Sequence, residues 1–149
     1  MPKQSAEWSA AFAAAAELTR RGYSVAFFLG NQPTYDALVS GNSSQNQFPV
    51  QIKGFKSKPK NSGAFGTAIL VGDLSGGQAD DWFIIVYAQM YKSLRQATFD
   101  PFEFFVAKRR DLQTIKNRGA PAVPKFTADW LSYDDLGPFR DAWQNLPPP

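Results

Sequence analysis

Hydrophobic and polar positions along this chain fall into short runs, and most runs predict one element of secondary structure. The alanine-rich segment 4–21 predicts a helix that ends at Gly22, because alanine favours helices and glycine commonly terminates them. Several residues recur at helical spacing, so they share one face of this helix, which is expected to pack on a sheet: Trp8, Phe12, Ala15, Ala16 and Thr19. Glu7 lies beside that face, at its margin.

Runs rich in β-branched and aromatic residues predict strands. They cover residues 23–29, 34–40, 48–55, 67–71, 82–88 and 102–107. The run at 82–88 is apolar throughout, which is typical of a strand that is covered on both faces. Helices are expected over 108–118 and 134–146. This order predicts an α/β fold with a central mixed β-sheet flanked by helices.

The length of 149 residues indicates one domain over residues 1–146, and Pro147 to Pro149 are expected to form a disordered proline tail. No apolar run approaches the roughly 20 residues of a membrane span, and no basic-then-apolar leader opens the chain. We therefore expect a cytoplasmic protein with no membrane partner.

The chain contains neither cysteine nor histidine, and this restricts its chemistry. Disulfides, thiolate zinc sites and cysteine nucleophiles are excluded, as are Ser-His-Asp catalysis and a histidine base. Any catalysis must use carboxylates, amides, hydroxyls, Lys, Arg, Tyr or a hard metal ion bound through oxygen.

The net charge of +3 is unevenly distributed. Residues 51–70 carry four lysines and no acid, residues 103–125 carry an excess of Lys and Arg, and the segment from Phe126 onward is acidic. Two basic segments fit a polyanionic partner, although solvated loops and helix faces explain them equally well.

Polar residues on two neighbouring predicted strands supply candidate chemistry. Gln51 and Lys53 alternate with Val50 and Ile52 and therefore share one face of their strand. An antiparallel hairpin can bring Asp36 to the same side of the sheet. The alternatives are a turn-capping aspartate and a solvent-exposed polar strand face. The pair Asp80 and Asp81, before the buried strand, is expected to form a cap or turn rather than a metal site.

The segment AELTRRGYSVAFFLGNQPTYDALVSGN and the following FPVQIKG resemble the PD-(D/E)XK nuclease superfamily, whose restriction-endonuclease-like core also occurs in Holliday-junction resolvases. The resemblance covers about residues 4–56 in order and spacing. Its motifs are the helix end at Leu18–Tyr23, Tyr-Asp at Tyr35–Asp36, and Gln-x-Lys at Gln51–Lys53.

This resemblance implies a metal-dependent endonuclease that acts on DNA, including branched DNA. It implies that Mg²⁺ or Mn²⁺ is held by Asp36, Gln51 and the backbone carbonyl of Ile52, while Lys53 positions the attacking water and stabilises developing charge. Glu7 is the candidate for a helix glutamate that completes the site, and Glu17 is the second choice. Gln51 departs from the acidic residue common at its position, which weakens metal binding.

Phosphate contacts are expected from the basic segments: Lys56, Lys58, Lys60, Lys108, Arg109, Arg110 and Lys116. The resemblance also makes a homodimer plausible. A second interpretation is a catalytically silent nuclease-fold protein that serves as a nucleic-acid-binding or protein-interaction module. A third is an unrelated α/β interaction protein without a nucleic-acid partner.

Overall fold

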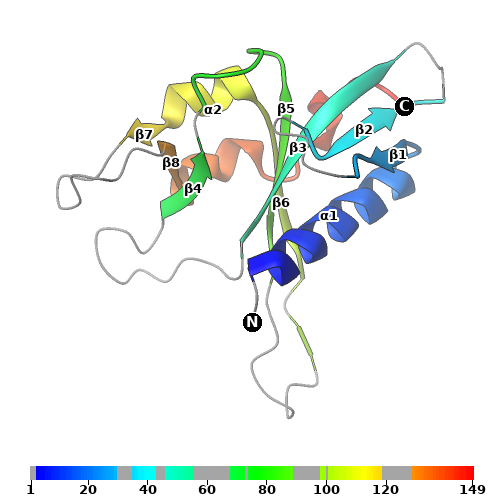
Figure 1. The fold of residues 1–149 in the computed structure, drawn as a ribbon, viewed down its shortest axis with the longest axis horizontal. Coiled ribbons are helices and arrows are strands. Elements are labelled where there is room, and N and C mark those ends of the chain that lie inside the picture. The colour runs from blue at the N-terminus through cyan, green and yellow to red at the C-terminus, as the bar shows by residue number, and fades with distance from the viewer. Residues whose placement is uncertain are drawn as a thin grey trace.

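The protein has an α/β fold built on a five-stranded mixed sheet with the strand order β1-β2-β3-β5-β6 (Figure 1). This computed structural model describes residues 3–29, 35–42, 46–55, 68–72, 74–88, 98–99, 101–118 and 129–149. The strands are β1 (Ser24–Phe27), β2 (Ala37–Ser40), β3 (Gln47–Phe55), β5 (Trp82–Tyr87) and β6 (Glu103–Lys108). Neighbouring strands are antiparallel except β3 and β5, which are parallel. The mixed sheet predicted from sequence is thus confirmed.

Helix α1 (Lys3–Arg20) covers one face of this sheet, but not with the predicted side chains. Its fully buried residues are Ala10, Ala14 and Leu18, whereas Trp8 and Phe12 are mostly exposed. The expected packing face was therefore wrong. The small side chains of Ala10 and Ala14 pack in the cluster between the helix and the sheet, whereas the exposed rings of Trp8 and Phe12 stack on each other.

The C-terminal end of α1 follows the sequence prediction. Gly22 has a φ of 92°, its N–H donates to the carbonyl of Thr19, and the N–H of Tyr23 donates to the carbonyl of Leu18. This pattern satisfies the last helix carbonyls and directs the chain into β1. In the described part of the chain, no helix has the length and apolarity needed to span a membrane.

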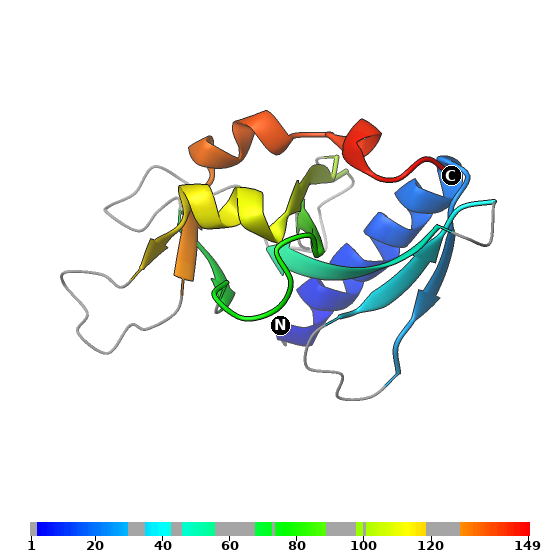
Figure 2. The ribbon, with the colours of Figure 1, turned by 90° about the horizontal axis from the view of Figure 1, so that it is seen from above.

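Among the described residues, a second layer packs on the other face of the sheet over β5 and β6 and reaches Phe55 of β3. There α2 (Arg109–Ile115), β8 (Asp129–Ser132) and the 3-10 helix η1 (Asp134–Phe139) enclose a second hydrophobic cluster. Strand β8 also pairs with β4 (Ala68–Gly72) and β7 (Asn117–Arg118) in a small three-stranded sheet that the sequence did not predict. In Figures 1 and 2 these elements lie at the opposite end of the molecule from β1 and β2.

Two predicted helices are shorter than expected. The helix predicted over 108–118 ends at Ile115, because residues 117–118 pair with β8 instead. The segment 134–146 forms two 3-10 helices, η1 and η2 (Trp143–Asn145), rather than one helix. Gly137 and Pro138 disfavour a continuous α-helix, and Asp141 has a positive φ of 49° between the two pieces.

Residues 147–149, expected as a disordered tail, lie against the β1–β2 hairpin in the structure. The Tyr23 hydroxyl donates a hydrogen bond to the carbonyl of Pro147, and a Cβ on Gly41 would lie 2.7 Å from the carbonyl carbon of Pro149. The glycine at position 41 thus leaves the space that the tail occupies.

A Gly41→Ala substitution is therefore expected to displace the tail and to lower the free energy of unfolding by about 1–2 kcal/mol, a typical cost of overpacking. Urea unfolding followed by circular dichroism measures this loss. Gly76→Ala is the matched control, because nothing lies within 4 Å of the Cβ it would add. Equal stability of the two variants would show that the tail does not pack at Gly41.

Candidate functional site

Asp36 lies immediately before β2, with its carboxylate against the centre of β3. Its N–H donates to the carbonyl of Val50 at 2.9 Å, and its Oδ2 accepts the N–H of Ile52 at 2.6 Å. Ile52 is the residue between Gln51 and Lys53. The antiparallel β2–β3 pairing therefore brings the predicted aspartate to the predicted Gln-x-Lys segment.

The backbone carbonyl of Ile52 belongs to the same arrangement. In a strand, the N–H and C=O of one residue point to the same neighbouring strand. Since the N–H of Ile52 binds the Asp36 side chain, its carbonyl also points toward the β2 side of β3. A carboxylate oxygen and a peptide oxygen thus both lie on the β2 side of β3.

Gln51 and Lys53 project from the face of β3 that α1 does not cover. Phe48, Val50 and Ile52 belong to the hydrophobic cluster beneath α1. Strand alternation directs Gln51 and Lys53 to the opposite face, where both are half-buried. The prediction that these two side chains share one face is consistent with this burial pattern.

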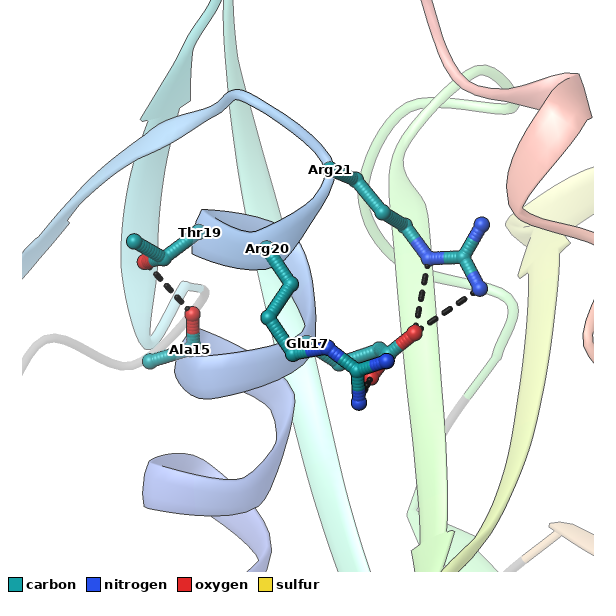
Figure 3. Close-up of polar contacts among 5 residues, drawn as sticks. All are labelled: Ala15, Glu17, Thr19, Arg20 and Arg21. Carbon is teal, nitrogen blue, oxygen red and sulfur yellow. Dashed lines mark hydrogen bonds and ion pairs between the residues drawn. The ribbon is translucent and has the colours of Figure 1, made fainter.

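The helix glutamates lie apart from Gln51 and Lys53. Glu7 is an exposed residue of α1, which packs on the other face of β3. Glu17 pairs with two arginines of its own helix end, at 3.1 Å from Arg20 and 2.8 Å from Arg21 (Figure 3). The structure therefore places both glutamates on the opposite side of the sheet from the Gln51 and Lys53 side chains.

The residues predicted to contact phosphate differ in their ion-pair partners and in their exposure to solvent. Lys56, Lys58 and Lys60 lie outside the described residues. Lys108 and Arg110 both pair with the exposed Asp80, and Lys116 pairs with Asp129. Arg109 is only 4% exposed. Its prediction as a phosphate contact is thereby corrected, because its guanidinium lies in the interior.

Arg109 instead forms a buried ion pair with Asp81, which is 7% exposed. Arg109 Nε lies 3.4 Å from Asp81 Oδ2, without the geometry of a hydrogen bond. The Tyr35 hydroxyl donates to Asp81 Oδ1 at 3.0 Å. Because Tyr35 directly precedes Asp36, this network ties the start of β2 to the start of β5 across β3.

The environment of the Arg109 guanidinium is closely packed. The group lies over the ring of Phe83, 5.0 Å from its centroid, and a Cβ on Gly77 would approach its Nη2 to 2.6 Å. Gly77 also has a φ of 80°, which favours glycine. Burial, and next the hydrogen bond to Asp81, raise the pKa of Tyr35 above its ordinary value. Tyr35 therefore remains a neutral donor well above neutral pH.

Sequence reasoning identified only part of this network. The expected turn at Asp80–Asp81 is present, since the Asp81 side chain accepts the N–H of Gln78 at 2.9 Å and its own N–H donates to the Gln78 carbonyl. The partnership with Arg109 was missed. An arginine in a run of three basic residues carries no sequence signal that distinguishes an interior ion pair from a surface contact.

The oxygen donors near Asp36 suit a hard divalent cation but contribute little charge. Asp36 offers a carboxylate, Gln51 an amide oxygen and Ile52 a peptide oxygen, and such ligands are those that Mg²⁺ prefers. Among the described residues, no group of three or more acidic, His or Cys side chains could hold a metal ion. A cation here would depend on one carboxylate and neutral oxygens.

Comparisons of the chain with protein-family models, curated proteins and solved structures found no match.

Proposed function

We propose that this protein is a divalent-metal-dependent phosphodiesterase that cuts DNA on a restriction-endonuclease-like core. One observation carries the proposal: the Asp36 carboxylate accepts the Ile52 N–H at 2.6 Å and so lies next to Gln51 and Lys53. An acid, two further oxygen donors and a lysine along one hairpin match what phosphodiester hydrolysis requires. The resemblance of residues 4–56 to the PD-(D/E)XK nuclease superfamily supports the same function.

Each proposed site residue would have a distinct role in the reaction. Asp36, the Gln51 amide oxygen and the Ile52 carbonyl would hold Mg²⁺ or Mn²⁺, which when bound would offset negative charge on the phosphate. The Lys53 ammonium would orient the attacking water by hydrogen bonding and stabilise charge that develops on the phosphate oxygens. Tyr35, anchored to Asp81, would hold the backbone of Asp36 in place.

DNA binding can use some of the paired cations. Exposed ion pairs contribute only about 0–1 kcal/mol, so Lys108 and Arg110 can exchange Asp80 for a phosphate at little cost. Arg109 cannot do so, because its charge is buried with Asp81. Lys108 and Arg110 are therefore the proposed phosphate contacts among the described residues.

Cleavage of plasmid, branched and single-stranded DNA in the presence of Mg²⁺ or Mn²⁺ tests the proposal. We expect cleavage that requires the metal ion and ceases with a chelator. Failure to cleave any of these substrates in either metal would contradict the proposed function.

A silent nuclease-fold protein is the second candidate, and the neutral side chain of Gln51 is the observation that favours it. The two functions differ in metal affinity. Calorimetry that shows no Mn²⁺ binding at millimolar metal, together with salt-sensitive DNA binding, would support the silent module over the enzyme.

Gln51→Glu is expected to tighten Mn²⁺ binding by roughly tenfold, because ligand charge is a main determinant of affinity for hard cations. Isothermal titration calorimetry measures the dissociation constant. The control is Gln47→Glu, which adds the same charge at an exposed position at the start of β3. A comparable tightening in both variants would mean that the metal responds to net charge and not to residue 51.

A further inference from the structure

Phe28 has a partly exposed ring next to the proposed metal ligands. Its N–H donates to the carbonyl of Asp36 at 3.0 Å, which extends the antiparallel β1–β2 pairing beyond Phe27 and Ala37. Phe28 therefore lies one strand spacing, about 4.8 Å, from Asp36 along the hydrogen-bonding direction. Its side chain is 40% exposed.

Strand alternation determines the face on which Phe28 projects. Val25 and Phe27 pack against the cluster beneath α1, where Phe27 meets the ring of Phe12 edge-on at 6.0 Å. Phe28 is accordingly directed to the opposite face, the one that carries Gln51 and Lys53.

On this face, the second hydrophobic cluster of the described residues does not extend over β1, β2 or most of β3. Among the described residues, the second hydrophobic cluster takes only Phe55 from these three strands. Figure 2 shows α2 and η1 at the other end of the molecule. A partly exposed aromatic ring, Asp36 and Gln51 thus follow one another across neighbouring strands, on the part of this face that the second cluster does not reach.

An aromatic side chain in this position can bind a nucleobase by its flat face. In a duplex both faces of each base are occupied by neighbouring base pairs, so a ring beside the cleaved phosphate can stack only on a base that is unpaired. Stacking of this kind tolerates any base sequence.

We propose that Phe28 is a stacking platform for the base next to the cleaved phosphate, and that the substrate is DNA unpaired at the cut. This inference rests on the proposed nuclease function. It adds the substrate class and one residue that selects it.

The test compares Phe28→Ala with the wild type on a single-stranded oligonucleotide and on the same sequence in a duplex. Loss of one stacked base is expected to lower kcat/KM on the single strand by roughly 5- to 100-fold. Duplex cleavage is expected to be weak and little changed. Phe28→Trp is expected to restore single-strand cleavage, because the indole offers a larger stacking surface.

Phe12→Ala is the matched control, since Phe12 is 60% exposed but projects from α1 on the other face. It is expected to leave kcat/KM on the single strand unchanged. Equal losses from Phe12→Ala and Phe28→Ala, or equal losses on both substrates from Phe28→Ala, would overturn the proposal.

An abasic site placed next to the cleaved phosphate in the single strand isolates the stacked base. The wild type is expected to lose activity on this substrate, whereas Phe28→Ala is expected to be insensitive to it. If both proteins lose activity equally, Phe28 does not stack on that base.

A binding measurement keeps the two proposals distinguishable. In EDTA, fluorescence anisotropy of a labelled single strand is expected to show weaker binding by Phe28→Ala even if no cleavage occurs. Cleavage that is unaffected by Asp36 and Lys53 variants would reject the proposed site alone. Binding and cleavage both unaffected by Phe28→Ala would reject the stacking platform alone.

Discussion

Asp36→Asn is expected to lower kcat/KM for DNA cleavage by on the order of 10³-fold or more, about 4 kcal/mol of lost transition-state stabilisation. The substitution removes the only carboxylate among the three proposed metal ligands. It leaves an amide oxygen that can still accept the Ile52 N–H, which Asp36 Oδ2 accepts at 2.6 Å. The fold is therefore expected to persist while the chemistry is lost. Initial rates on a labelled oligonucleotide, measured across Mg²⁺ concentrations, give the effect.

The accompanying variants separate catalysis from folding. Lys53→Met is expected to lower kcat by roughly 10²- to 10³-fold, because it removes one charge that stabilises the transition state. Asp135→Asn changes an exposed carboxylate of η1 and is expected to leave the rate unchanged. Cleavage that survives both Asp36→Asn and Lys53→Met would show that the active site lies elsewhere.

Local sequence signals predicted α1 and the strands of the central sheet. Alanine content and Gly22 set α1 and its end, and the apolar run at 82–88 indicated the strand that is buried on both faces. These elements follow from residues near one another in the chain. The small sheet of β4, β8 and β7 does not, because its pairing joins segments far apart in sequence.

The packing face of α1 shows why hydrophobicity alone can mislead. Trp8 and Phe12 carry the larger apolar surfaces, yet Ala10 and Ala14 are the buried positions. Close approach of a helix to a sheet favours small side chains at the contact, and a pattern that weighs each residue by its hydrophobicity does not register this preference.

Only two sequence signals bear on the candidate site, namely the order of the strands and the alternation of side chains along them. Both led to Asp36, Gln51 and Lys53 on one hairpin, and the hydrogen bond from the Ile52 N–H to Asp36 Oδ2 places the aspartate beside this segment of β3. Glu7 was chosen from its place on the helix, but the face on which α1 packs decides its position. The ion pair of Asp81 and Arg109 depends on tertiary contacts that no local pattern encodes.

The buried ion pair of Asp81 and Arg109 is expected to contribute strongly to the stability of the fold. Arg109→Met is expected to lower the free energy of unfolding by about 3–5 kcal/mol, because it leaves the Asp81 carboxylate buried without its cation. The methionine side chain retains part of the packing against Phe83. Urea unfolding monitored by tryptophan fluorescence measures the change.

Two further variants test that explanation. The double variant Asp81→Asn/Arg109→Met removes both charges and is expected to recover part of the loss, since no buried carboxylate remains uncompensated. Arg110→Met breaks an exposed pair with Asp80 and is expected to cost no more than about 1 kcal/mol. If Arg109→Met were no more costly than Arg110→Met, the interior pair would not be a main support of the fold.

The Arg109→Met substitution is also expected to slow cleavage. The Tyr35 hydroxyl donates to Asp81, so disturbing Asp81 is expected to loosen the backbone at the neighbouring Asp36.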